Sequence, residues 1–198
     1  MKIQVIIGAD RPGNVTTRVA KWAAAAASAH EDFEVEIVDL AEYKLPFLYE
    51  AGSPRYNPAR TLAPAEQAFL DKIAEADGYI VTSPEYNRTM PAVLKNAIDF
   101  LGHQMDRKPV ALVTHGSTGG AVAAENIRTA LRAMSVANVP EAVTMIGASE
   151  LLDEEGKLAE AAKSNPYGPE FMLGTLVESL HWWTRTLKLG RESLVAAQ

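Results

Sequence analysis

Short apolar runs recur five times along the chain, and each is followed by a longer stretch of helical character. The first run, Ile3 to Ile7, is rich in β-branched residues and stops at Gly8, as a buried strand does. In the second run, Phe33, Val35 and Ile37 alternate with polar residues, which is typical of a strand at the edge of a sheet. The pattern predicts strands at residues 3–7, 33–40, 78–82, 109–114 and 139–146.

Between the apolar runs, apolar residues return every three or four positions. Phe69 and Ile73 share one stripe, and Leu94, Ile98 and Leu101 share another. The predicted helices cover about residues 17–30, 64–76, 91–101, 121–136 and 169–189. Strands that alternate with helices form a parallel sheet with helices on both faces.

The number of strands narrows the fold to an α/β three-layer sandwich. Five parallel strands fit the flavodoxin-like order 2-1-3-4-5 better than the six-stranded dinucleotide-binding fold. The chain has 198 residues with no internal repeat or low-complexity linker, so we expect residues 1–198 to form one domain. Two long connections, 41–63 and 148–165, are candidates for functional loops.

Composition limits the classes of function. Apolar residues make up 47% of the chain and charged residues 22%, as in an ordinary globular protein. The net charge of −6 disfavours nucleic acid and anionic membranes as partners. The chain has no cysteine, so redox activity would need a bound cofactor. The N-terminal apolar run is too short for a signal peptide, which predicts a cytoplasmic protein.

The loops after the first, third and fourth strands meet at the carboxyl edge of such a sheet, where ligands bind. In the first of them, Asn14, Thr16 and Thr17 offer donors and Arg11 offers positive charge just before a helix N-terminus. This composition indicates a phosphate cradle. A capped turn, with Thr16 or Thr17 as the N-cap, explains the loop equally well, and Asp10 disfavours an anion.

The loop after the third strand places an aromatic residue between two prolines. Tyr86 lies between Pro84 and Pro91, and Pro91 opens a helix, where its missing N–H costs little. We interpret Tyr86 as a platform for a flat ligand.

The loop after the fourth strand, Gly116 to Gly120, contains three glycines. They indicate a floor where a planar ring can lie against backbone amides, and the alternative, a simple strand-to-helix turn, would need one glycine rather than three. Ser117 directly follows Gly116, so the loop lacks the Gly-x-Ser-x-Gly spacing of a hydrolase nucleophile, and His115 is not thereby a catalytic base.

Other familiar signatures are missing from the sequence. Neither a P-loop nor Gly-x-Gly-x-x-Gly occurs in the first loop, and the four histidines show no metal-ligand spacing. The adjacent Trp182 and Trp183 cannot both face the core, so one of them is expected at the surface, in a subunit interface.

Together the loops resemble the NADPH-dependent FMN reductase family of flavodoxin-like proteins. The most specific part is Ser83 to Asn87 with Pro91 to Asp99, and the resemblance covers nearly the whole chain. It implies FMN as cofactor, NADPH or NADH as co-substrate, and a homodimer or homotetramer. Carried over to this sequence, it implies phosphate contacts from Arg11, Asn14, Thr16 and Thr17, and a flavin site lined by Pro84, Glu85, Tyr86, Asn87, Ser117, Gly119 and Gly120.

Two positions depart from the family pattern. The family commonly has serine where this chain has Ala9, and close relatives often have arginine where Asn14 stands. Each lost charge-assisted contact is worth roughly 1.5–3 kcal/mol, so weaker binding of the FMN phosphate is expected.

The resemblance implies an FMN-dependent NAD(P)H oxidoreductase that passes a hydride from nicotinamide to FMN and on to a flavin, quinone or azo acceptor. The flavin supplies the chemistry, so no catalytic side chain is predicted. Two alternatives stay open: a flavodoxin-type electron carrier without NAD(P)H activity, and a module that kept the fold and lost the cofactor.

Overall fold

The computed structural model describes residues 1–57 and 59–196, in which strands and helices alternate. The strands of this part are β1 (Lys2–Ile7), β2 (Glu34–Asp39), β3 (Gly78–Pro84), β4 (Pro109–His115) and β5 (Ala137–Met145). The longer helices are α1 (Thr16–Ser28), α3 (Pro64–Ala74), α4 (Ala92–Phe100), α5 (Ala121–Arg132) and α8 (Pro169–Ala196). The short helices α2 (Leu40–Tyr43), α6 (Ala148–Leu151) and α7 (Glu160–Lys163) and the 3-10 turn η1 (Pro54–Tyr56) lie in the connections.

All strand pairs of the sheet are parallel, and the order is β2-β1-β3-β4-β5. The predicted strand order is confirmed. Every residue of β3 and β4 is buried, which explains why their sequences read as continuous apolar runs. The alternating strand β2 lies at an edge, as its polar face predicted.

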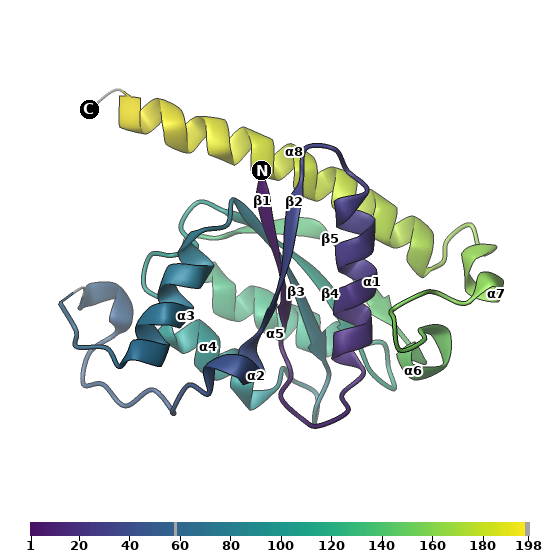
Figure 1. Ribbon diagram of the computed structural model, residues 1–198, viewed down its shortest axis with the longest axis horizontal. Coiled ribbons are helices and arrows are strands. Elements are labelled where there is room, and N and C mark those ends of the chain that lie inside the picture. Colours follow the sequence, from purple (N-terminus) through teal and green to yellow (C-terminus); the bar gives the residue numbers. More distant parts are fainter. Residues whose placement is uncertain (58, 197–198) are drawn as a thin grey trace.

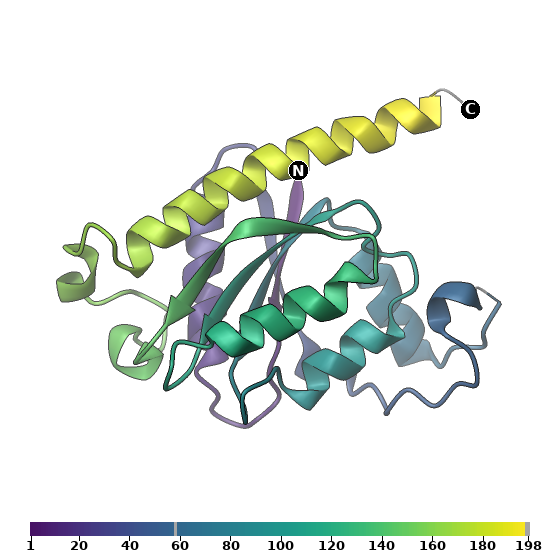
Figure 2. The ribbon, with the colours of Figure 1, turned by 180° about the vertical axis from the view of Figure 1, so that it is seen from behind.

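Helices cover the two faces of the sheet in separate groups. Helices α1 and α8 lie together on one face, and the view from behind shows α4 and α5 on the other (Figures 1 and 2). One apolar cluster joins α1 and α8 to the sheet, with Trp22, Leu176 and Leu180 among its buried residues. The second cluster joins α3, α4 and α5 to it, around Phe69, Phe100 and Ile127.

Several predicted boundaries differ from the structure. Strand β3 continues to Pro84 because Ser83 and Pro84 pair with Thr114 and His115 of β4, although none of these residues is aliphatic. Helix α8 continues seven residues beyond the predicted end at 189, and its last turns extend past the sheet (Figure 1). The two long connections contain the short helices and the 3-10 turn rather than irregular loop alone.

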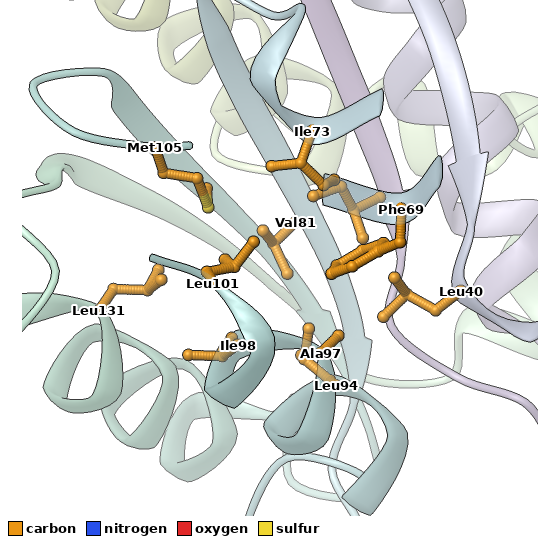
Figure 3. Close-up of a pocket in the computed structure, with 11 residues that line it drawn as sticks. Leu40, Phe69, Ile73, Val81, Leu94, Ala97, Ile98, Leu101, Met105 and Leu131 are labelled. Atoms are coloured by element: carbon orange, nitrogen blue, oxygen red, sulfur yellow. The ribbon is translucent and has the colours of Figure 1, made fainter. Parts of the chain in front are cut away.

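A cavity of about 20 Å³ lies within the layer of α3, α4 and α5 (Figure 3). Its lining is apolar throughout, with Val81 from the sheet, Leu94 and Leu101 at the ends of α4, and Met105 among the side chains that surround it. A buried water needs several polar partners, which this lining does not offer. The cavity is therefore a gap in core packing between the sheet and its helices, not a ligand site at the carboxyl edge of the sheet.

Candidate active site

The first loop runs from the end of β1 to α1 and is closed by Asn14. The Asn14 side-chain amide donates to the carbonyl of Arg11 at 2.9 Å, and its oxygen accepts from the Thr17 N–H at 3.2 Å. The side chain that bonds the first turn of α1 is therefore that of Asn14, next to the N-cap residue Val15, and the alternative in which Thr16 or Thr17 caps the helix is wrong. The N–H groups of Arg18 and Val19 both donate to the carbonyl of Val15, at 3.0 and 3.2 Å.

Thr16 lies inside the protein. Its side chain is fully buried, and its Oγ1 shares a hydrogen bond of 2.9 Å with Nε2 of His115 at the end of β4. Burial lowers the pKa of His115 to about 4, so its imidazole is neutral at pH 7. The pair holds the start of α1 against β4. Thr16 therefore presents no exposed surface to a ligand, whereas Asn14 and Thr17 remain partly exposed.

The second loop is a tight hairpin. Tyr86 and Thr89 exchange both backbone hydrogen bonds, at 2.9 and 3.0 Å. Asn87 and Arg88 between them have φ values of 50° and 65°, as a two-residue turn with both central residues left-handed requires. Asparagine adopts this region readily, whereas for arginine it costs roughly 1–2 kcal/mol. The turn fixes the position of Tyr86.

The Tyr86 ring meets a residue of the first loop. The guanidinium carbon of Arg11 lies 3.8 Å from the centre of the ring, which is a cation–π contact. Two predicted site residues that are 75 positions apart in the sequence are thus brought into contact. Arg11 and Asn87 are exposed, Tyr86 is half-buried and Pro84 is buried.

The Glu85 side chain points away from the Tyr86 hairpin and toward α5. Its carboxylate accepts from the N–H groups of Val122 and Ala123, at 3.1 and 3.2 Å, and from the hydroxyl of Thr118 at 3.2 Å. Only 7% of the side chain is exposed. A carboxylate here satisfies the helix N-terminus and its positive partial charge. Glu85 therefore ties the second loop to the third.

The third loop turns sharply through two glycines with left-handed backbone. Gly119 and Gly120 have φ values of 84° and 81°. A Cβ atom on Gly120 would lie 2.7 Å from the backbone nitrogen of His115, so only glycine fits there. Both glycines are buried, and Ser117 is exposed at the tip of the loop. The strand-to-helix turn is therefore present, and its left-handed backbone requires glycine at both positions.

A cavity of about 330 Å³ opens at this edge, bordered by Val15 at the start of α1, by His115 to Ser117 and by Gly147 to Glu150. The last segment follows β5 and overlaps the start of the 148–165 connection, a candidate functional loop by its length, although none of its residues was a predicted site residue. Ile146, just before it, is 65% exposed beside Gly119. The exposure of Ile146 is visible only in the structure, so the sequence carried no signal for this segment beyond the length of the connection that follows.

The donor set and the shape of this edge are compatible with an anionic ligand that carries a flat ring. The first loop offers the N-terminus of α1 and one arginine, and Asn14 leaves that N-terminus without an acidic cap. The second loop offers an aromatic ring, and the buried turn at Gly119 and Gly120 sets the path of the third loop beside it.

A family model described as NADPH-dependent FMN reductase matches residues 1–150. The chain belongs to this family. The matched part contains all three loops and the segment after β5, so the resemblance expected from the sequence is confirmed. In the part of the chain that the structure describes, no helix is long and apolar enough to cross a membrane.

Individual members of the family are similar to the chain over different lengths. An NADPH azoreductase from Bacillus sp. (strain OY1-2) is 34% identical over 166 residues, which cover 82% of this chain and 85% of that protein. An NAD(P)H-dependent FMN reductase from Schizosaccharomyces pombe is 34% identical over 127 residues, and the chain spans only 64% of its length.

Among solved structures, the flavoenzyme NAD(P)H:(acceptor) oxidoreductase from Paracoccus denitrificans has a similar fold. Its TM-score is 0.70 at 20% identity, with 93% of this chain and 97% of that chain covered. At this identity the similarity concerns the fold alone.

Proposed function

We propose that this protein is an FMN-dependent NAD(P)H oxidoreductase that reduces small-molecule acceptors. The observation that carries the proposal is the meeting of Arg11, Tyr86 and the Gly119-Gly120 turn at one edge of the sheet, in a member of the FMN reductase family. The acceptor class we propose is that of azo compounds, quinones or free flavins, and similarity to a protein named NADPH azoreductase supports it.

In this proposal the phosphate of FMN binds at the first loop. Arg11 supplies charge, and the N-terminus of α1 supplies positive partial charge. Arg11 would have to leave Tyr86 to do so. The cation–π contact of an exposed arginine is worth about 0.5–1 kcal/mol, whereas a charged hydrogen bond to phosphate is worth about 1.5–3 kcal/mol. The phosphate therefore wins the competition for Arg11.

The roles of the predicted site residues follow from where their side chains lie. Asn14 and Thr17 close the first loop, and Thr16 holds it to His115, so these three act mainly by shaping the backbone.

Tyr86 and Asn87 would border the ring from the hairpin, with Pro84 behind them. From the third loop, the ring would be bordered by Ser117, Gly119 and Gly120. Glu85 holds the two loops together.

Bound FMN would supply hydride transfer between nicotinamide and acceptor. The protein positions the ring and limits access to it, and no side chain has to move a proton. His115, the histidine at this edge, is buried, hydrogen-bonded and neutral, which suits a structural role.

The experiment that tests the proposal compares FMN with riboflavin, which lacks the phosphate. Purified protein is mixed with each flavin and desalted, and its visible spectrum is followed during anaerobic addition of NADPH or NADH. We expect FMN to be retained in preference to riboflavin and to bleach. Retained FMN that does not bleach would indicate an electron carrier, and equal retention of the two flavins would refute a phosphate site.

Two variants locate the binding site. Arg11→Ala should weaken FMN binding about tenfold to a hundredfold and leave riboflavin binding unchanged. Tyr86→Ala should weaken the binding of both flavins. The matched controls are Arg132→Ala at the far end of α5 and Tyr167→Ala, whose side chains are exposed away from the three loops. An effect of the controls as large as that of the site variants would refute the assignment.

We also propose that the protein is a homodimer or homotetramer. Trp182 of α8 is 59% exposed while Trp183 packs against the core, so the expected division between the two rings is confirmed and leaves one large aromatic surface uncovered. Glu85 and Lys95 do not need a second subunit as partner, because Glu85 bonds to α5 and Lys95 to Asp99 within the same chain. Light scattering tests the assembly, and a monomer with full activity would contradict it.

A further inference from the structure

Three side chains with metal-binding groups meet at the other end of the sheet from the three loops. His30 follows the end of α1, Asp32 precedes β2, and His181 lies within α8. One ligand atom of each residue lies within 4.8 Å of the others. The two histidines are 151 positions apart in the sequence, which is why no ligand spacing was visible there.

Direct contacts hold the three side chains together. Nε2 of His181 lies 2.8 Å from Oδ2 of Asp32, and the two imidazole rings are stacked with their centres 4.0 Å apart. The Asp32 N–H donates to Nδ1 of His30 at 3.3 Å. Phe33 packs against both histidines, at 5.0 and 5.6 Å between ring centres, and forms an apolar wall.

Two imidazoles and one carboxylate form a donor set that suits Zn²⁺ and similar first-row ions. Ligand atoms about 2.0–2.1 Å from a tetrahedral ion lie roughly 3.4 Å from one another. The separations here are up to 4.8 Å and the two imidazoles are stacked, so binding requires these exposed or half-exposed side chains to rotate and the stack to open. We propose that His30, Asp32 and His181 bind one divalent transition-metal ion of the zinc class, with water at the fourth position.

The location indicates a structural ion rather than a catalytic one. Its ligands join the turn between α1 and β2 to α8, whose last turns extend past the sheet (Figure 1). An ion that binds the folded state alone stabilises it by mass action. The positive charge of Arg185 near Asp32 opposes the ion, so binding should be of moderate strength.

The competing explanation is an ion pair with a stacked histidine and no metal. The two explanations differ in what added metal does. An ion pair with stacking gives the same unfolding temperature with and without Zn²⁺, whereas a metal site gives a rise that saturates at one ion per chain.

The test uses the full chain without a histidine tag, stripped of metal with a chelator that is then removed. Zn²⁺ is titrated by calorimetry and thermal unfolding is measured with and without it, and Co²⁺ serves as a spectroscopic probe of the ligands. We expect one Zn²⁺ per chain and a higher unfolding temperature. No saturable binding up to about 1 mM would overturn the proposal.

Variants separate this site from other histidines. We expect Zn²⁺ binding to weaken by about tenfold to a hundredfold in each of three variants, His30→Gln, His181→Asn and Asp32→Asn. Asp32→Asn keeps an acceptor for His181, so it should fold even if the histidine variants do not. His103→Asn is the control, because His103 is bonded to Asp106 in a different part of the surface. Zn²⁺ binding that is unchanged in all three site variants would show an adventitious ion only and would refute the site.

Discussion

Glu85 allows a quantitative test of how the candidate site is held together. The carboxylate accepts hydrogen bonds from two backbone N–H groups of α5 and from one hydroxyl, with 7% of its side chain exposed. Glu85→Ala removes all three acceptor contacts and the charge at the helix N-terminus. Loss of a helix cap costs about 0.5–2 kcal/mol, and loss of a favourable charge in a partly buried position costs up to about 2 kcal/mol. We therefore expect a loss of about 2–3 kcal/mol.

Glu85→Gln separates the charge from the hydrogen bonds. Glutamine keeps one acceptor oxygen for the α5 N–H groups and loses the negative charge, so we expect a loss of about 1 kcal/mol. The ion pair with Arg88 adds little, because the Arg88 side chain is 69% exposed and its nitrogen lies 3.9 Å from the carboxylate.

Urea unfolding of the two variants and the wild type gives the free energies directly. Glu125→Ala is the matched control: it lies on the same helix, its side chain is 71% exposed, and its ion pair with Arg128 should change stability by less than about 0.5 kcal/mol. If Glu85→Ala is no more destabilising than Glu125→Ala, or if alanine and glutamine have the same effect, the cap does not hold the two loops together.

Three further predictions concern other parts of the structure. His115, whose pKa is lowered to about 4, stays neutral in the folded state, while the unfolded chain binds a proton below about pH 6.5. The free energy of unfolding is therefore highest above pH 6.5 and decreases toward pH 4 by up to about 3 kcal/mol. In His115→Gln, urea unfolding between pH 4 and 6.5 should lack this part of the slope, and an unchanged slope would contradict the assignment. Gly120→Ala should cost about 2–4 kcal/mol in thermal or urea unfolding, because its Cβ would lie 2.7 Å from backbone at a φ of 81°, whereas Gly174→Ala, in open space on α8, should stabilise by about 0.5–1 kcal/mol. Trp182→Gln should shift the assembly measured by light scattering toward smaller species with little change in monomer stability, and an unchanged assembly would exclude Trp182 from the interface.

The strands could be predicted because the cause of their structure is local. Burial on both faces makes β3 and β4 continuous apolar runs, and alternation marks β2 as an edge. Once the strands are known, parallel pairing brings the three loops to one edge. The extension of β3 to Pro84 was missed because its last residues are polar or cyclic and are buried by their partners in β4.

The roles of individual side chains in the loops depend on partners that sequence proximity does not reveal. Glu85 lies in a predicted ligand-binding loop, yet its carboxylate binds the start of α5, 37 and 38 residues later. Thr16 has the composition of a phosphate ligand, yet its hydroxyl binds His115, 99 residues away. In both cases a polar group that seemed available to a ligand is used to hold one loop to another. A buried polar group must be hydrogen-bonded, so the partner of each such group decides whether the ligand can use it. The sequence thus predicts which loops form the site, and only the structure separates Arg11, which contacts Tyr86 and which we propose binds the phosphate, from the residues that keep the loops in place.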